Sequence, residues 1–414
     1  MAAAKKLAGM LAELGRISDE PGRLTRTFLS PAMRRANRQV GKWMREAGLA
    51  VRVDGVGNLI GRLASRNPKA KTLLIGSHLD TVRNAGKFDG ALGVLLPIVA
   101  LAELRQRKVK LPFHVEVLGF SEEEGVRFAS AYLGSKGYAG QLSASELKHR
   151  DARGISIAQA LAQFNGGSFS PPRAARKQSN LLGYFEVHIE QGPVLEKEKL
   201  AVGVVSAIAG QTRGKVRFRG KAGHAGTTPM TLRRDALAGS AEFVLAVETL
   251  AQSSPGLVAT VGVLEVPGAA PNVVPGETTL TLDVRHARDG AREAAVESCL
   301  LAAQEIARRR KLRFDWQRTQ QNGAVACAPV LAALLAQSVR AVQGRSLSLV
   351  SGAGHDAVVM SALTPVAMLF VRCREGLSHH PDEHASPADV AVALRVAENF
   401  IERLARNASA KTII

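Results

Sequence analysis

The sequence predicts an α/β fold with a second, smaller domain inserted into it. Short β-branched runs alternate with longer helical patterns, which is typical of strands covered by helices. A different rhythm, of βαββαβ order, begins after residue 210, and an α/β strand resumes at 365–371. We therefore expect a larger domain made of residues 1–210 and 327–414, with residues 211–326 inserted between its two parts.

The first part of the larger domain has simple element signals. An amphipathic helix is expected at 1–17, and an apolar helix at 91–104 follows a Gly-rich turn. A Gly/Ser/Pro/Arg stretch at 165–179 is typical of a surface excursion. Three runs rich in β-branched and aromatic residues predict strands, at 72–77, 113–120 and 184–189.

The insert has its own element order. The expected elements are a strand at 215–219, a helix at 231–251, strands at 258–265 and 277–285, a helix at 290–310 and a strand at 312–318. This βαββαβ order describes a small antiparallel sheet covered by two helices.

The composition limits the classes of protein to which the chain could belong. The chain has 414 residues, of which 46% are hydrophobic and 22% charged, so it can form large cores and is not disordered. No apolar run approaches the ~20 residues that a membrane span requires. The three cysteines, Cys299, Cys327 and Cys373, are isolated. They form neither a disulfide framework nor a CxxC metal knuckle, so we expect a reducing cytoplasm.

The net charge of +19 raises the question of a nucleic-acid or membrane partner. The basic residues are scattered, no nucleic-acid-binding signature accompanies them, and aromatic residues make up only 4%. We therefore expect no specific nucleic-acid partner and no membrane partner. Most of the charge is assigned to solvated surface, with steering of small anions as a secondary effect.

Metal-type ligands stand at the ends of predicted strands. His78 ends the first strand, in Gly-Ser-His-Leu-Asp-Thr, and Asp80 could fix its tautomer. Asp89 lies in a turn between glycines, where each carboxylate oxygen could bind one cation. Alone, the first motif would be a surface histidine and the second a helix N-cap.

Two further places complete the pattern. The adjacent carboxylates at 122–124 follow the second strand, where one could ligate a metal and its neighbour act as general base. The alternative is a solvated acidic turn. His188 ends the third strand, and the run Ser-His-His-Pro at 378–381 lies on a late loop. This mixed nitrogen and oxygen set suits Zn²⁺ or Mn²⁺ and indicates a two-metal hydrolytic site.

Nine motifs together resemble a known family. They are GSHLDTV, KFDGALGV, SEEEGVRF, HIEQGP, GHAGTTPM, PNVVP, LDVRH, SGAGHDA and LSHHPDE. The set resembles the hydantoinase/carbamoylase branch of the two-metal aminoacylase–carboxypeptidase clan, over about residues 50–390. The branch includes allantoate amidohydrolases, N-carbamoyl-L-amino-acid hydrolases and β-ureidopropionases. The resemblance implies a mixed-sheet, aminopeptidase-like catalytic domain, an inserted lid and dimerisation domain, a homodimer, and two divalent metal ions per subunit.

The resemblance also implies roles for single residues. Its metal ligands map onto His78, Asp89, Glu124, His188 and His379. His78 and His188 would each hold one metal beside the bridging Asp89, and Glu124 and His379 would complete the second metal. Glu123 would be the general base. His379 is chosen over His380 because the family pattern places the ligand directly after the serine.

The expected substrate contacts also follow from the resemblance. His224 would reach across the dimer to stabilise an oxyanion. The residues expected to bind substrate are Gln191, Gln211, Arg213, Asn272, Arg285 and Gly354. A guanidinium also clamps a carboxylate in a bidentate fork, which suits Arg213 or Arg285 to an acidic substrate. His355 and Asp356 either face the substrate or form a turn.

The expected activity is hydrolysis of a C–N bond in a small anionic ureido or N-carbamoyl acid. Gly210–Arg213 and the turn AGKFDG resemble the allantoate amidohydrolases more than the carbamoyl-amino-acid hydrolases. This resemblance implies allantoate, and hence purine catabolism, with N-carbamoyl-L-amino acids or a β-ureido acid as the alternatives. A dipeptidase or aminoacylase of the same clan is a further alternative. Outside hydrolysis, the remaining hypotheses are a metal-free scaffold with the same fold and a weak, salt-dependent nucleic-acid binder.

Overall fold

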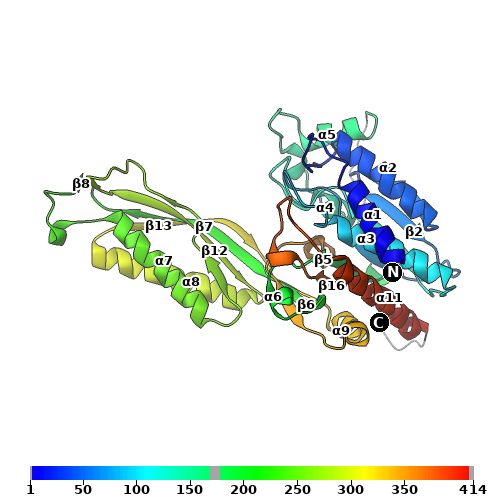
Figure 1. Cartoon of the computed structure of the whole chain (residues 1–414). Helices are drawn as coiled ribbons and strands as arrows, with labels where there is room; N and C mark the ends of the chain where they lie inside the picture. The colour runs from blue at the N-terminus through cyan, green and yellow to red at the C-terminus, as the bar shows by residue number, and fades with distance from the viewer. Residues whose placement is uncertain (1, 168–177, 410–414) are drawn as a thin grey trace. The chain divides into compact units, whose positions relative to one another are not determined.

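The computed structural model describes residues 2–167 and 178–409, so most of the predicted excursion at 165–179 lies outside the described residues. The chain forms two compact units (Figure 1). Unit 1 consists of Met1–Ser206 and Cys327–Ile414, and unit 2 is Ala207–Ala326. In the described part of the chain, no helix has the length and apolar character needed to cross a membrane.

Unit 1 is built on a mixed sheet with the strand order β1-β2-β4-β3-β5-β16-β6-β14, and β15 pairs with β6. The strands β4, β3, β5 and β16 run parallel, whereas β2 and β6 are antiparallel to their neighbours in this group. The bounds are β1 (Ala50–Val53), β2 (Leu59–Leu63), β3 (Thr72–His78), β4 (His114–Phe120), β5 (Leu181–Ile189), β6 (Val202–Ile208), β14 (Val325–Ala326), β15 (Ser348–Ser351) and β16 (Val366–Val371).

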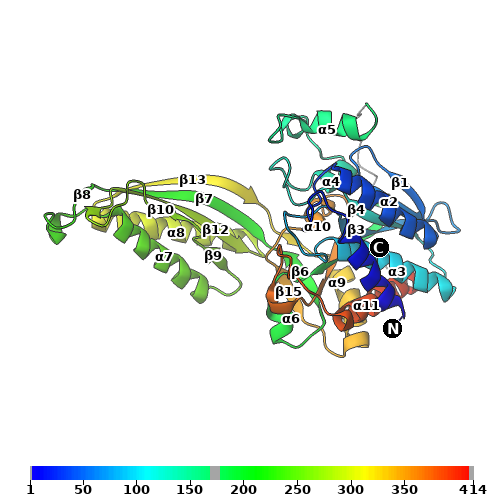
Figure 2. The same cartoon turned by 45° about the horizontal axis from the view of Figure 1, so that its top comes forward.

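Helices bury this sheet. The strands β3, β4, β5 and β16 are buried along their whole length, as expected for parallel strands with both faces covered. Helices α1, α3 and α11 pack against one another (Figures 1 and 2), and α3 also lies on β3 and β5. The main helices are α1 (Ala2–Leu14), α2 (Pro31–Glu46), α3 (Ala91–Gln106), α9 (Pro329–Gln343) and α11 (Pro387–Ser409). Short helices are α4 (Leu133–Ala139), α5 (Ile157–Phe164), α6 (Val194–Lys197) and α10 (Asp356–Met360).

The parallel strands determine where the chemistry lies. β3 ends at His78, β4 ends just before the carboxylates at 122–124, and β5 ends one residue after His188. Because the carboxyl ends of parallel strands meet at one edge of a sheet, these three segments come together there.

Unit 2 has an antiparallel sheet of order β10-β12-β7-β13, with β9 beside β12. Its long strand β12 alternates between buried and half-buried residues, since the helices α7 and α8 cover one face (Figure 1). The bounds are β7 (Gly210–Arg219), α7 (Ala236–Ser253), β9 (Val258–Thr260), β10 (Leu264–Glu265), β12 (Glu277–His286), α8 (Asp289–Arg310) and β13 (Arg313–Asn322). A separate pair joins β8 (Gly223–His224) to β11 (Val273–Val274).

Some expected bounds were wrong. The helix predicted from residue 231 begins at Ala236, because Asp235 accepts a hydrogen bond from the Ala238 N–H (3.0 Å) and caps it there. The strand predicted at 258–265 is interrupted at 261–263 and forms two short strands. The first helix ends at Leu14.

Candidate metal centre

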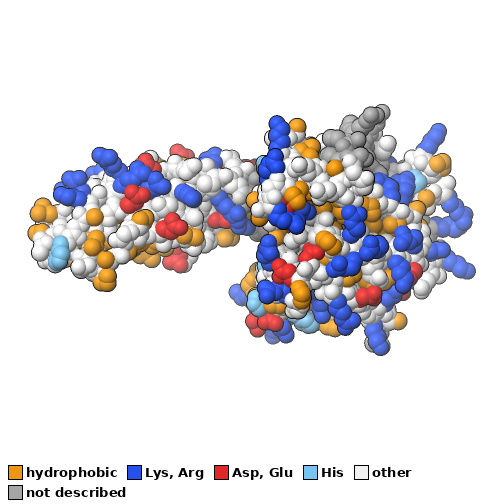
Figure 3. Space-filling model, turned by 90° about the horizontal axis from the view of Figure 1, so that it is seen from above, with side chains coloured by type: hydrophobic (Ala, Val, Ile, Leu, Met, Phe, Trp, Pro, Cys, Tyr) orange, Lys and Arg blue, Asp and Glu red, His pale blue; other side chains and the backbone are white. Residues whose placement is uncertain are grey.

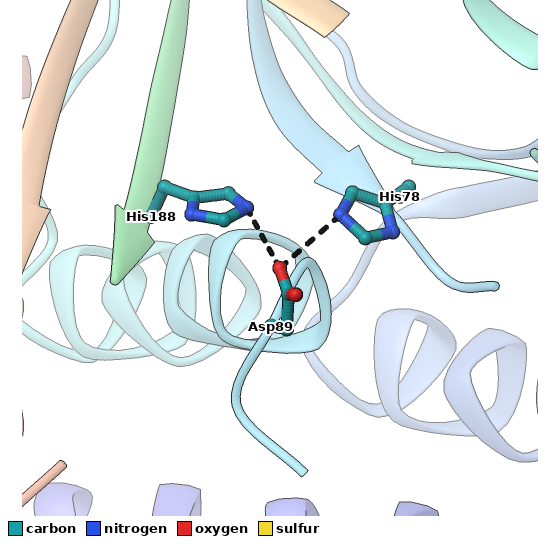
Figure 4. A group of neighbouring side chains, drawn as sticks. All are labelled: His78, Asp89 and His188. Atoms are coloured by element: carbon teal, nitrogen blue, oxygen red, sulfur yellow. Dashed lines mark ion pairs between the residues drawn. The ribbon is translucent and has the colours of Figure 1, made fainter. Parts of the chain in front are cut away.

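Two histidines at strand ends direct their Nε2 atoms to one oxygen of Asp89. The distances to Asp89 Oδ1 are 3.6 Å from His78 and 3.1 Å from His188 (Figure 4). Their Nδ1 atoms lie 3.0 Å and 2.9 Å from the backbone carbonyls of Asp80 and Ile189. Because a carbonyl can only accept, each Nδ1 carries a proton, and Nε2 is the nitrogen of each ring that faces Asp89.

Asp89 lies in a tight turn and is not the N-cap residue of the helix that follows. Helix α3 begins at Ala91, and its N-cap residue, Gly90, has a φ of 62°. A Cβ on Gly90 would collide with the imidazole of His78, so only glycine fits between the turn and that ring. The Asp89 side chain is thereby left free of the helix end and points at the two histidines (Figure 4).

The second oxygen of Asp89, Oδ2, lies beside a different set of side chains. His379 Nε2 lies 3.3 Å from Asp89 Oδ2 and 3.7 Å from Glu124 Oε2. The neighbouring His380 instead turns its Nδ1 to Asp382, at 3.6 Å from the carboxylate. The geometry therefore groups His78 with His188 on one oxygen and His379 with Glu124 on the other. This differs from the sequence-based division, in which His78 and His188 each hold a separate ion.

The structure distinguishes the three adjacent glutamates. Both carboxylate oxygens of Glu122 accept backbone N–H bonds, from Gly125 and Leu133, so this residue closes the loop. Glu123 and Glu124 donate their backbone N–H groups to the carboxylate of Asp80, at 3.0 Å and 3.2 Å. Their side chains face the site, where carboxylate oxygens of both lie within reach of His78. Asp80 thus fixes the position of this loop relative to β3.

The cluster concentrates negative charge in a place poorly accessible to water. Burial raises the pKa of Glu124 to about 7, and the charge of Asp89 adds to this effect. A hydrogen bond with Asp89 raises the pKa of His379 to about 9. Burial alone would raise the pKa of Asp89, but hydrogen bonds with His188, His379 and His78 hold it well below its usual range. The raised pKa values of Glu124 and His379 show that the site favours added positive charge.

The donor atoms fit divalent metal ions. Two ligands about 2.0–2.1 Å from a tetrahedral zinc lie roughly 3.3 Å apart. The pairs at Asp89 are separated by 3.1–3.6 Å. Imidazole nitrogen and carboxylate oxygen suit Zn²⁺ and Mn²⁺, and the carbonyl bonds at Nδ1 are the outer contacts that orient ligating histidines. The cluster is therefore compatible with divalent metal binding.

Three supporting residues lie on the Asp89 side of the cluster, and sequence reasoning missed two of them. Glu383 Oε1 accepts the backbone N–H groups of Phe88 and Asp89, at 2.9 Å and 3.0 Å. Ser378 donates its hydroxyl to Glu383 Oε2 at 3.0 Å and lies 3.3 Å from Asp89 Oδ2. Gln191, expected to bind substrate, places its Nε2 3.3 Å from the same Asp89 oxygen. Glu383 and Ser378 both belong to the motif LSHHPDE, but the motif does not reveal their contacts with the turn at Asp89, which is distant in sequence.

The SGAGHDA loop packs behind His188. The ring of His355 lies edge-on to that of His188, with centroids 4.5 Å apart, and its Nε2 is 2.7 Å from the hydroxyl of Ser351. Burial lowers the pKa of His355 well below its usual value, so the ring is neutral. Gly354 abuts the hydroxyl of Tyr132 so closely that a Cβ there would collide with it. The loop thus supports the ring of His188 on the side away from Asp89.

In unit 2, three expected substrate residues surround a carboxylate that the sequence analysis did not single out. Asp283 Oδ2 accepts hydrogen bonds from Gln211 (2.9 Å), Arg213 (2.8 Å) and Arg285 (2.8 Å). Asp283 faces Arg213 across the β12–β7 ladder, and Arg285 faces Gln211. The signal available in the sequence was the two-residue spacing of Asp283 and Arg285, which puts both side chains on one face of a strand.

The other two expected residues of unit 2 lie next to each other at the β8–β11 pair. His224 is exposed, and its Nδ1 accepts the Gly226 N–H at 3.1 Å. The carbonyl of Asn272 accepts the Ala225 N–H at 2.8 Å. Within unit 2, these residues form a group separate from the one around Asp283.

Comparisons with known proteins find relatives over nearly the whole chain. A family model described as peptidase family M20/M25/M40 matches residues 74–403. Allantoate deiminase 2 of Glycine max is 41% identical, over 95% of this chain and 88% of that protein. An N-carbamoyl-L-amino acid amidohydrolase of Geobacillus stearothermophilus is 38% identical, over 97% and 98%. A hydantoinase/carbamoylase-family amidase of Burkholderia multivorans has a similar crystal structure, with a TM-score of 0.90 at 32% identity over 96% and 97%.

Proposed function

The chain belongs to peptidase family M20/M25/M40, and from this premise we propose that it is a metal-dependent amidohydrolase acting on ureido or N-carbamoyl acids. The observation that carries the proposal is the carboxylate of Asp89, which has two histidines at one oxygen and His379 with Glu124 at the other. Each oxygen can serve one ion. Such a shared carboxylate is the arrangement of two-metal hydrolytic sites.

Five residues would hold the ions. We propose that His78, His188 and Asp89 would hold one, and that Asp89, Glu124 and His379 would hold the other, as Zn²⁺ or Mn²⁺. When bound, such ions lower the pKa of water and polarise a carbonyl group. Glu383 and Ser378 would keep the Asp89 turn and the His379 loop in register, since both contact the two segments.

Glu123 is the proposed general base. Its carboxylate faces the cluster, while its backbone is fixed by Asp80 and its neighbour Glu122 is fully engaged in the loop. Glu123 would take the proton of the attacking water and pass it to the departing nitrogen. A carboxylate on a short, anchored loop is suited to carrying a proton between two positions without rearrangement of the backbone.

Six residues are proposed to bind the substrate. Arg213 and Arg285 would hold the substrate carboxylate, with Asp283 orienting both guanidinium groups. Gln211 and Asn272 would contact the amide end, with Gln191 and Gly354 close to the reacting group. His224, supplied by the second subunit of a homodimer, would stabilise the oxyanion. Two arginines around one aspartate leave a net positive charge, which suits an acidic substrate.

We assign allantoate as the preferred substrate. Support comes from the relatives named allantoate deiminase, which align over nearly the whole chain. The paired arginines also suit a molecule with one carboxylate and polar ureido arms. N-carbamoyl-L-amino acids are the second candidate, because relatives named for that activity align equally far along the chain.

The test is ammonia release from protein reconstituted with Mn²⁺ or Zn²⁺. Allantoate is offered beside a panel of N-carbamoyl-L-amino acids and a β-ureido acid. We expect the highest kcat/KM on allantoate. Faster turnover of a carbamoyl amino acid would transfer the assignment to the second candidate, and no turnover of any compound by the metal-loaded protein would refute the proposal.

A cytoplasmic homodimer is part of the proposal. The three cysteines are free and buried, as suits a reducing compartment. Unit 2 exposes large apolar side chains that a partner subunit could cover. They are Met230, Leu232, Leu245, Val258, Val263, Leu264 and Leu301. Sedimentation at micromolar concentration should give twice the mass of one chain, and a monomer would contradict this.

A further inference from the structure

Unit 1 has a cavity of about 870 Å³ that no step of the proposed reaction uses. Its cationic side chains are all arginines, although the chain also contains many lysines. We call it the arginine cavity. Its arginines are Arg34, Arg35, Arg38, Arg83, Arg127 and Arg153.

These arginines converge from separate parts of the chain. Three lie on α2, Arg83 follows β3, Arg127 follows β4, and Arg153 lies in a turn before α5. Helices α2 and α5 lie at the same end of unit 1 (Figures 1 and 2). Gathering like charges is unfavourable unless counter-charge is supplied. On the face that Figure 3 shows, Lys and Arg side chains are spread over much of the surface.

The acidic residues in the lining do not supply enough counter-charge. Asp151 pairs with Arg127, at 3.1 Å from Nε and 3.0 Å from a terminal nitrogen. Asp19 accepts backbone N–H bonds from Thr27 and Ala32. Six arginines against these two aspartates leave a formal charge of +4. Including Glu20, which pairs with Arg83 at 3.3 Å, leaves +3.

Several of the guanidinium groups are held in place without being neutralised. Arg34 donates to the carbonyl of Phe164 at 3.0 Å and lies 4.2 Å above the centre of that ring. Arg35 donates to the carbonyl of Ser18 at 2.7 Å. For Arg38 and Arg153, no carboxylate among the described residues lies within ion-pair distance. Carbonyl contacts orient a guanidinium but leave its charge uncompensated.

The rest of the lining is mixed, with the polar residues Thr27, Ser30 and Gln163 beside apolar ones. Leu29, Pro31, Val126, Ala160 and Phe164 contribute to the wall. Small-molecule sites commonly have volumes of about 300–1,000 Å³ and combine apolar walls with a few polar groups. The cavity therefore suits a compact organic ion with a charged and an uncharged part.

We propose that the arginine cavity binds a small organic anion that carries at least two phosphate groups. A phosphate monoester has roughly −1.5 to −2 charges near pH 7, so two of them match the excess of +3 to +4. The guanidinium fork binds phosphate oxygens in bidentate fashion, which explains why arginine rather than lysine lines the cavity.

Two arginines of the cavity lie on the loops that carry residues of the metal centre. Arg83 lies three residues after Asp80, and Arg127 three residues after Glu124. An anion held by both would join the loop that follows β3 to the loop that follows β4. Those loops carry the residues that orient His78 and present Glu123, so their relative motion would be restricted.

The first test is calorimetric titration of the metal-loaded protein with fructose 1,6-bisphosphate, with fructose as the uncharged control. Arg34→Gln/Arg38→Gln should weaken bisphosphate binding by at least ~10-fold, since hydrogen bonds to charged groups are lost. The matched control is Arg52→Gln/Arg395→Gln, which removes the same charge from exposed positions outside the cavity. Equal weakening in both variants, or no binding by the wild type, would overturn the proposal.

A second measurement locates the ligand without any substitution. Amide hydrogen exchange of the wild-type protein is compared with and without fructose 1,6-bisphosphate. We expect slower exchange at 81–85, 125–130 and 151–155, which border the cavity. Protection confined to other segments would place the binding elsewhere and overturn the assignment.

Discussion

The carboxylate of Glu383 accepts the backbone N–H of Asp89 at 3.0 Å, although the two residues are 294 positions apart in the chain. The same carboxylate accepts the hydroxyl of Ser378, the residue before His379. One buried side chain therefore ties the turn that presents Asp89 to the loop that presents His379. Because Gly86 abuts Glu383 so closely that a Cβ there would collide with it, the turn and the carboxylate fit without intervening space.

Replacing Glu383 should loosen the metal centre without removing a ligand. We expect Glu383→Ala to lower affinity for Zn²⁺ by ~10–100-fold, as losses of orienting contacts commonly do. The Zn²⁺ affinity of Glu383→Gln, which keeps one acceptor oxygen, should lie between that of Glu383→Ala and that of the wild type. The control is Asp382→Ala at the exposed neighbouring position. Competition with a chelator measures the affinity, and an unchanged value in Glu383→Ala would show that Glu383 only supports the fold.

Glu123 should matter for turnover and not for metal content. Glu123→Gln removes the proton acceptor but preserves shape, so kcat should fall by ~10²–10⁴-fold. Elemental analysis should find the same metal content as in the wild type. The kcat of Glu122→Gln serves as a comparison, because Glu122 accepts backbone hydrogen bonds within the loop and does not face the cluster. A Glu123→Gln enzyme with near-normal turnover would remove Glu123 from the role of base.

The two adjacent histidines should respond differently to substitution. His379 faces Asp89 and Glu124, whereas His380 faces Asp382 at the surface. His379→Ala should therefore lose one of two metal ions and most of the activity. His380→Ala should retain both ions and near-normal turnover. The reverse result, read by elemental analysis of the two purified variants, would move the ligand assignment to His380.

Asp283 should influence substrate affinity through the arginines that it orients. Asp283→Asn weakens its bonds to Arg213 and Arg285, so KM for an acidic substrate should rise by about 10-fold with metal content unchanged. Asp315→Asn is the matched control, because Asp315 pairs with Arg219 elsewhere in the same sheet. Steady-state kinetics of both variants measures the two KM values. An equal rise in KM would indicate a general effect of charge on unit 2.

The fold was predictable where the pattern was local. The buried strands of unit 1 and the βαββαβ order of unit 2 follow from apolar runs and turn residues, and the structure has these elements. Helices such as α2 and strands such as β1 and β6 were not predicted. α2 is strongly amphipathic but rich in arginine, and β1 is exposed along most of its length, so neither has the apolar signal of a core element.

The site was predictable where a side chain follows a strand. His78 and His188 stand at strand ends, and parallel topology brings such ends together. Glu383 was missed because its partners Phe88 and Asp89 are 295 and 294 residues away in the sequence. Asp283 was missed although its two-residue spacing from Arg285 was visible, because its contacts with Gln211 and Arg213 depend on strand pairing. The grouping of the ligands at Asp89 likewise depends on the turn geometry at Gly90, which the motif alone does not give.

Asp89 is proposed to join two metal ions that the reaction requires. The most direct measurement titrates Mn²⁺ or Zn²⁺ into chelator-treated protein while ammonia release from allantoate and bound metal are followed together. Activity should rise to a plateau at two ions per chain, and Asp89→Asn should bind fewer ions and show almost no turnover. Full activity of the wild type without added metal, at a measured metal content near zero, would contradict the proposed metal requirement.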